Sequence, residues 1–159
     1  MRRIPLILGL VLASWSAHAA AGPAPDPGQA EATVREVLAR VLSPVLKATD
    51  KAGDDRRFLT PDLYAAFQKG AQAFDADPYT GSQEPESFSL RSLSRTTAKD
   101  PARIDVTATF AVTGFPDSKP RITYRMRHTG MGWRIDDIRY HDDEQSMRGL
   151  LRRGPSSGP

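Results

Sequence analysis

Apolar residues in this chain follow a helical spacing in the N-terminal half and alternate at every second position in the C-terminal half. Over residues 29–43 one stripe recurs at three- and four-residue intervals, which predicts an amphipathic helix: Val34, Val37, Leu38, Val41 and Leu42. Pro44 removes a backbone donor and disfavours helical geometry at Ser43, so the helix is predicted to end or kink there.

A second helix has a clear start signal. Thr60 suits the N-cap, Pro61 the first helical position, and Asp62 the positive end of the helix dipole. Leu59 is expected to pack on Tyr64 across this cap. The predicted buried stripe of this helix is Leu63, Phe67, Ala71 and Phe74. The helix is expected to end before Asp77-Pro78.

Strand patterns begin at Phe88 and Leu90 and are plainest over 104–112, 122–128 and 133–140. Matching the apolar faces pairs Phe110 with Tyr124. A two-residue turn at Gly130-Met131 places His128 opposite Trp133. The outward polar face is then predicted to hold Thr107, Thr109, Arg125, Arg127, Arg134 and Asp136.

The last strand breaks its alternation, because Ile138 follows Ile135 by three positions. A β-bulge at Asp136-Asp137 would return Ile138 to the core side. Met147, Leu150 and Leu151 are expected to form a short terminal helix, and 153–159 a disordered tail. The predicted fold is α+β: N-terminal helices on one face of a curved four-stranded antiparallel sheet, within a single domain at 29–152.

The first residues predict export. Arg2 and Arg3 precede an apolar run, Ile4–Val11, and Ala17-His18-Ala19 is a small-residue cleavage site, so residues 1–19 are interpreted as a signal peptide. The apolar run is much shorter than the roughly 20 residues that span a bilayer, so no membrane anchor is expected. Residues 20–28 form a Pro/Gly/Ala-rich, flexible lead-in. The predicted location is the periplasm, although the cell exterior stays open.

Charge and cysteine content exclude several functions. Residues 1–19 carry two of the 22 basic residues and none of the 19 acidic ones, so the exported chain is almost neutral and no nucleic-acid partner is expected. The chain has no cysteine. This excludes a disulfide scaffold, a thiolate metal site, a thiol nucleophile and a lipid-modified cysteine.

Three segments carry a family resemblance: Leu59-Thr60-Pro61-Asp62-Leu63-Tyr64, Asp77-Pro78-Tyr79, and Gly132-Trp133-Arg134-Ile135-Asp136-Asp137-Ile138. They resemble small exported proteins of a bacterial domain-of-unknown-function family with a nuclear transport factor 2-like (cystatin-like) fold. The resemblance implies a curved sheet that wraps a helix and leaves a conical pocket, and it leaves a homodimer possible. It carries over no catalytic motif, because the superfamily includes isomerases, dehydratases and binding modules.

A pocket between helix and sheet would be lined by Tyr64, Phe67, Phe110, Tyr124, His128 and Trp133. The alternative is that these residues are simply core. His128 is the candidate catalytic base, on the core face near Trp133. The alternative for His128 is a partly buried ring that hydrogen-bonds to backbone.

Three polar groups each allow two interpretations. Arg125, Arg127 and Arg134 are either an anion-binding patch or a solvated face balanced by Asp105 and Asp136. Asp136 and Asp137 supply a base or a cation site, or else they mark a bend and pair with Arg125 and Arg139. The run 141–144 is read as a polar connection rather than a metal site, so no metal or cofactor is expected.

Without a nucleophile–base pair or a set of metal ligands, the preferred function is a soluble exported binding or interaction module. Its partner would be a periplasmic protein or a small ligand. The alternative is a small pocket enzyme, an isomerase, dehydratase or hydrolase, that uses His128. This alternative requires the His128 ring to face an open cavity within hydrogen-bond reach of a second polar group.

Overall fold

The computed structural model describes residues 24–43, 54–142 and 144–154. In order, the helices and strands are α1 (Pro27–Val41), α3 (Pro61–Gly70), β1 (Phe88–Thr97), β2 (Arg103–Val112), β3 (Arg121–Thr129), β4 (Gly132–Tyr140), β5 (Gln145–Ser146) and α4 (Met147–Arg153). Short 3-10 turns lie at Asp54–Arg57, Ala71–Ala73 and Pro85–Ser87. The predicted signal peptide at 1–19 and most of the predicted tail at 153–159 lie outside the described residues.

The strands form an antiparallel meander in the order β1-β2-β3-β4-β5, which confirms the α+β class. Over the described residues the sheet has five strands, so the predicted count of four is wrong. The fifth strand is only the pair Gln145–Ser146, which bonds to Arg139 and Tyr140 after the chain reverses. A strand of two residues is too short to show alternation, so its position could not be predicted from the apolar pattern.

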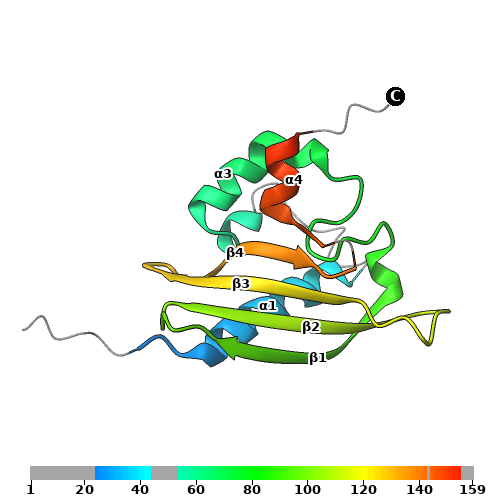
Figure 1. Ribbon diagram of the computed structural model, residues 1–159, viewed down its shortest axis with the longest axis horizontal. Coiled ribbons are helices and arrows are strands. Elements are labelled where there is room, and N and C mark those ends of the chain that lie inside the picture. The colour runs from blue at the N-terminus through cyan, green and yellow to red at the C-terminus, as the bar shows by residue number, and fades with distance from the viewer. Residues whose placement is uncertain (1–23, 44–53, 143, 155–159) are drawn as a thin grey trace, which may run out of the picture.

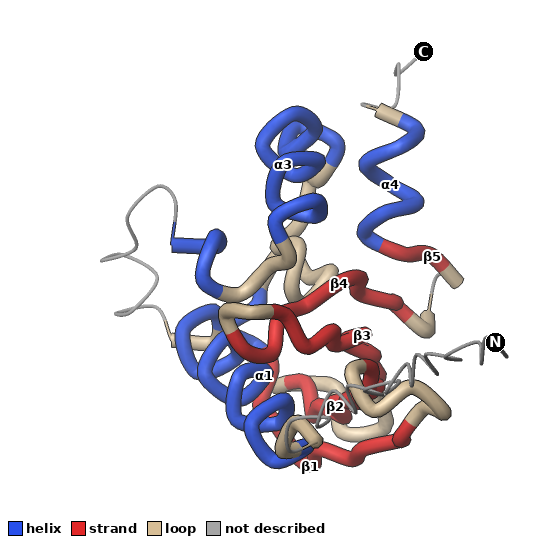
Figure 2. The backbone as a smooth tube through the Cα atoms, turned by 90° about the vertical axis from the view of Figure 1, so that its left-hand side faces the viewer, coloured by secondary structure: helices blue, strands red, loops and turns tan. Residues whose placement is uncertain are grey.

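Helix α1 covers one face of the sheet, and α3 and α4 lie beside each other beyond β4 (Figures 1 and 2). The prediction that both N-terminal helices pack on one sheet face is therefore correct for α1 and wrong for α3. Phe58, Leu59 and Thr60 guide α3 to the edge, because they pair with β4 as a short parallel bridge. The Thr60 amide donates to the Ile135 carbonyl at 2.9 Å, and the Ile135 amide donates to the Phe58 carbonyl at 2.7 Å.

The helix bounds differ from those predicted, most of all for α3, which ends at Gly70 and not just before Asp77. α1 begins two residues early, since the Asp26 carboxylate accepts from the Gly28 amide at 2.8 Å and Pro27 occupies the first turn. α3 begins at Pro61 after Thr60, as predicted, but the Thr60 side chain makes no cap hydrogen bond. Ala71 lies in a 3-10 turn and is exposed, so its predicted place in the buried stripe is wrong.

The predicted register of β2 with β3 is wrong by four residues. Tyr124 lies opposite Val106 rather than Phe110, and Ile122 lies opposite Ala108. An even slip keeps every side chain on its face, so the apolar pattern cannot detect it. The connection at 113–120 shifts the register, since Pro120 has no amide hydrogen for the ladder and its carbonyl accepts from the Phe110 amide at 3.0 Å.

The other strand predictions are confirmed. His128 lies opposite Trp133 across the Gly130-Met131 turn, and Met126 lies opposite Ile135. Next along the ladder Arg125 faces Asp137, so Asp136 is the extra residue of a bulge in β4. Because of this bulge, both Ile135 and Ile138 are fully buried.

Candidate functional site

The facing surfaces of α1 and the sheet are closed to solvent. On α1, Val34, Val37 and Leu38 are each 1 % exposed or less, and the residues on the facing side of the sheet are buried as well. Of the residues predicted to line a cone, Phe110 and Tyr124 are fully buried, and Trp133 is 2 % exposed. Tyr64 and Phe67 are half-buried and pack against the same core. Phe110, Tyr124 and Trp133 are therefore part of the hydrophobic core, and the other two lie at its margin.

Two of the buried aromatic residues form hydrogen bonds from their polar atoms to backbone carbonyls. The Tyr124 hydroxyl donates to the Tyr79 carbonyl at 2.8 Å, and the Trp133 indole N–H donates to the Asp26 carbonyl at 2.8 Å. Burial raises the pKa of Tyr124 well above its ordinary value, so the hydroxyl keeps its proton and acts as a structural donor. The indole bond ties the start of α1 to β4.

The His128 ring is half-buried and packs edge-on against Trp133, with ring centroids 5.3 Å apart. No described side chain forms a hydrogen bond with this ring. The backbone amide of His128 donates to the Ala102 carbonyl at 2.8 Å. The second polar group that an enzymatic role requires is thus missing from the described neighbours of His128.

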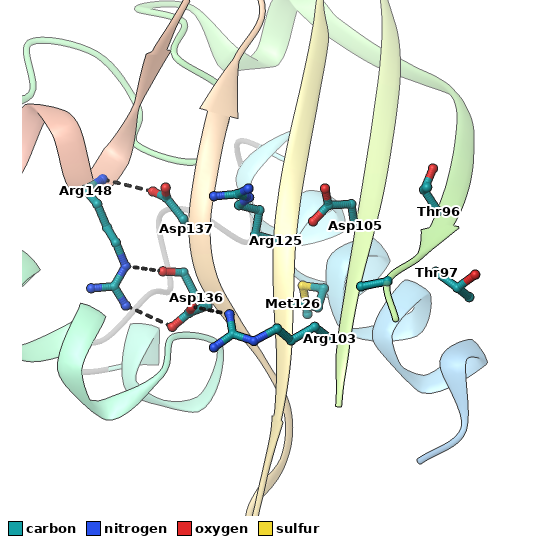
Figure 3. A pocket seen from close by; sticks show the side chains of 10 residues that line it. Thr96, Thr97, Arg103, Asp105, Arg125, Met126, Asp136, Asp137 and Arg148 are labelled. Carbon is teal, nitrogen blue, oxygen red and sulfur yellow. Dashed lines mark hydrogen bonds and ion pairs between the residues drawn. The ribbon is translucent and has the colours of Figure 1, made fainter. Parts of the chain in front are cut away.

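The bulge in β4 places Asp136 at the centre of an ion-pair cluster on the opposite, outward face of the sheet. Asp136 has a 16 % exposed side chain. Its carboxylate accepts from the Arg148 guanidinium at 2.9 Å and lies 3.6 Å from Arg103 (Figure 3). It also lies 3.2 Å from Arg127. We call Asp62, Asp136, Arg103, Arg127 and Arg148 the bulge cluster.

Arg148 joins α4 to this cluster. Its Nε donates to the Asp136 carbonyl at 2.6 Å, and its guanidinium also donates to Asp62 at 2.7 Å. The backbone amide of Arg148 donates to the Asp137 carboxylate at 3.0 Å. Asp137, 8 % exposed, therefore satisfies an amide in the first turn of α4. The partners expected for these acids, Arg125 and Arg139, are not the partners found.

The bulge cluster lowers the pKa of the Asp62 carboxyl. Burial raises the pKa of this carboxyl, but hydrogen bonds from Arg148 and from its own backbone amide outweigh burial and hold the pKa at about 2. A depressed pKa means that the ionised form stabilises the fold above the ordinary value of 3.8. This contribution is lost as the pH falls through about 2.

Beside the bulge cluster the outward face is hollowed to about 300 Å³. The wall of this polar hollow consists of Thr96, Thr97, Ala98, Arg103, Asp105, Arg125, Met126, Asp136, Asp137 and Arg148. Figure 3 shows Arg125 between Asp105 and Asp137. Arg125 is opposite both acids in the strand register, yet it forms no ion pair or hydrogen bond among the described residues. Its guanidinium is left available to a ligand.

The predicted arginine patch is divided by these contacts. Arg125 lies in the polar hollow, whereas Arg127 donates to Asp62 at 2.6 Å and belongs to the bulge cluster. Arg134 lies opposite Arg127 in the strand register, and its guanidinium donates to the backbone carbonyl of Trp133 at 2.8 Å. Acids of the bulge cluster thus offset the like-charge pair of Arg127 and Arg134.

The run 141–144 carries an interaction of another kind. His141 Nε2 lies 2.8 Å from the Thr123 hydroxyl, which in turn lies 2.8 Å from the Thr107 hydroxyl. Asp143 lies outside the described residues. Among those that are described, no three His, Asp or Glu side chains are grouped closely enough to hold a metal ion.

Sequence reasoning found Arg125 and Asp136 but missed Arg103, Arg148 and the role of Asp62. Asp62 was explained by the helix dipole alone, although it also binds two arginines. Arg148 has no motif of its own, since only the docking of α4 beside α3 brings it to the bulge (Figure 2). No local spacing in the sequence could reveal a cluster assembled from five separate elements.

No protein-family model and no curated protein matches the sequence. Among solved structures, one similar chain is the phospholipid-binding protein from Ralstonia solanacearum, determined in complex with a phospholipid. It is 16 % identical, the alignment covers 78 % of this chain and 84 % of that chain, and the TM-score is 0.45. These values are too low to place the two proteins in one family. Within the described residues, no helix is long and apolar enough to cross a membrane.

Proposed function

We propose that this chain is an exported binding module without chemistry of its own, and that it binds a small ligand in the polar hollow. Arg125 carries this proposal. This residue is half-buried, lines a hollow of about 300 Å³, and has no described side-chain partner. A guanidinium in such a position is a strong site for a bidentate carboxylate or phosphate. The volume lies at the lower end of the range of small-molecule pockets.

The acids of the hollow restrict the ligand further. Asp136 and Asp137 are already engaged by Arg148, whereas Asp105 has no described partner. A simple anion on Arg125 would lie close to the Asp105 carboxylate and would be repelled by it. A ligand group with both a negative charge and a cationic donor satisfies the two residues together. We therefore propose a zwitterionic ligand group, with the Thr96 and Thr97 hydroxyls as further partners.

We propose that the protein acts in the periplasm after removal of residues 1–19, and that its fold is a nuclear transport factor 2-like fold with a filled cone. The helix α1 lying across one sheet face supports the second point. The charged start, short apolar run and Ala17-His18-Ala19 site support the first. N-terminal sequencing of protein from a periplasmic extract should begin at Ala20, and an intact Met1 would contradict export by cleavage.

The binding proposal is tested with Arg125→Gln. The full chain, labelled with ¹⁵N, is titrated with glycine, leucine and phosphocholine while amide shifts are followed. At least one of these zwitterions should shift resonances around the polar hollow, and Arg125→Gln should weaken its binding about 10- to 100-fold, since it removes a charged hydrogen-bond donor.

Arg139→Gln is the matched control. Arg139 lies on β4 outside the polar hollow, is exposed, and makes no described ion pair. The control should bind as the parent does. Equal weakening in both variants, or shifts confined to other surfaces, would contradict the proposed site.

A further inference from the structure

A second hollow of about 350 Å³ lies at the same end of the sheet. Its wall consists of Ala24, Pro25, Asp26, Pro27, Thr97, Ala98, Lys99, Pro101, Arg103, Ile104 and Trp133. We call it the apolar groove, because its exposed surface is mostly carbon. Trp133 and Ile104 are each 2 % exposed and supply its floor, and the Trp133–Asp26 hydrogen bond fixes the N-terminal side of the groove against β4.

The apolar groove and the polar hollow adjoin. They share Thr97, Ala98 and Arg103, at the turn between β1 and β2. Arg103 stands at the junction with half of its side chain exposed. It is held only by loose contacts, 3.4 Å from Asp100 and 3.6 Å from Asp136. A single small molecule can therefore occupy both spaces without displacing a tight ion pair.

We infer that the ligand is a small amphiphile, with a zwitterionic head on Arg125 and Asp105 and an apolar chain in the groove against Trp133. This inference rests on the proposed function and names the ligand class of the same site. The charged groups of the head would pair with Arg125 and Asp105, which have no described ion-pair partner of their own. The alkyl chain would move from water to a surface that is mostly carbon. Alkyl amino acids and short phosphocholine lipids share this chemistry.

The experiment uses the full chain with Trp15→Phe, so that Trp133 is the sole tryptophan. Alanine, 2-aminohexanoic acid, 2-aminooctanoic acid, 2-aminodecanoic acid and hexylphosphocholine are the probes. Calorimetry gives the affinity, and Trp133 fluorescence reports occupation of the groove. Each added pair of methylenes should tighten binding roughly four- to tenfold until the groove is full, since the chain is only partly enclosed. Whether the amino acids or the phosphocholine bind more tightly identifies the source, and either result supports the shared chemistry.

Pro25→Glu places a charge in the apolar groove, outside α1 and away from the polar hollow. It should weaken 2-aminooctanoic acid about tenfold or more while leaving alanine unchanged. Pro116→Glu is the matched control, because Pro116 is exposed in the turn between β2 and β3. Octanoate and octylamine, which carry one charge each, should bind less tightly than 2-aminooctanoic acid.

Several results would overturn this inference. Affinity that is independent of chain length, with unchanged Trp133 fluorescence, rejects the amphiphile but spares the proposed function as long as Arg125→Gln still weakens binding. If affinity rises with the length of the alkyl chain but Pro25→Glu and Pro116→Glu change it equally, the alkyl chain does not bind in the apolar groove. Tighter binding of octanoate than of 2-aminooctanoic acid rejects the zwitterionic head. If no probe binds up to about 10 mM, corresponding to less than about 3 kcal/mol, both proposals fail.

Discussion

Replacing Trp133 with alanine should lower the free energy of unfolding by about 3–5 kcal/mol, as measured by urea denaturation. The indole is 2 % exposed, contacts the His128 ring, and donates to the Asp26 carbonyl. The alanine variant leaves a cavity at the joint between α1 and β4, and it leaves that carbonyl with only the longer bond from the Gln29 amide, at 3.2 Å. This loss should be the larger of the two stability effects predicted here.

Two further variants separate the causes. Trp133→Phe keeps a ring but removes the donor, and should account for only part of the loss, about 1–2 kcal/mol. Met131→Ala, in the adjacent turn, is the surface control, because Met131 is 57 % exposed. Its effect should stay within about 0.5 kcal/mol. A Trp133→Ala protein as stable as the Met131→Ala protein would show that α1 is not fastened to β4 in this way.

Asp136→Asn should be the second largest loss, about 2–3 kcal/mol in urea denaturation. The substitution keeps the shape of the side chain but removes the charge that Arg103, Arg127 and Arg148 surround. Breaking a fully buried pair costs about 3–5 kcal/mol, and partial exposure together with the remaining Asp62 lowers that figure. The arginines left around the amide repel one another, and α4 loses part of its attachment to β4.

Asp62→Asn is the matched control, since Asp62 binds two of the same arginines but has a 54 % exposed side chain. Solvent screening should limit its effect at neutral pH to about 1 kcal/mol or less. Since the pKa of Asp62 is about 2, its share of stability disappears as the pH falls from about 4 to 2, and Asp62→Asn should flatten that part of the acid-unfolding curve. Equal losses in the two variants at pH 7 would contradict a central role for Asp136.

Alternation was the most reliable signal in the sequence. It placed Ile104, Val106 and Tyr124 on the closed face of the sheet and located the bulge from a single broken interval at Ile138. It could not set the β2–β3 register, since a slip of four residues keeps each side chain on its face. Only the length and the prolines of the connecting turn decide between the two registers.

The position of α3 depends on contacts that a local pattern does not contain. Thr60 and Pro61 mark the start of this helix correctly, but the main-chain pairing of Phe58–Thr60 with Ile135 determines where the helix lies. The Thr60 hydroxyl lies 3.3 Å from the Asp136 carboxylate instead of capping its own helix. A residue that matches a local capping pattern can still form its side-chain hydrogen bond with a distant segment.

Only part of the candidate site could be predicted from the sequence, because the rest depends on contacts between distant segments. Alternation placed Arg125 on the correct face. That Arg125 has no described ion pair depends on the positions of Arg103 and Arg148, which also line the hollow. The aromatic residues were interpreted either as a pocket or as core, and burial of Phe110 and Tyr124 puts both in the core. Packing density, which decides whether a cone is open or filled, is a property of all the side chains together.

The central claim is that α1 closes the apolar face of the sheet, so that binding takes place on the polar outward face and its rim. Single cysteines on β2 test it most directly, because the natural chain has none. Val106→Cys replaces a fully buried side chain, and Thr109→Cys a half-buried one on the opposite face. In native protein, maleimide should label Thr109→Cys readily and leave Val106→Cys unmodified until urea unfolds it. Comparable labelling of both cysteines in the folded protein would contradict a closed face beneath α1.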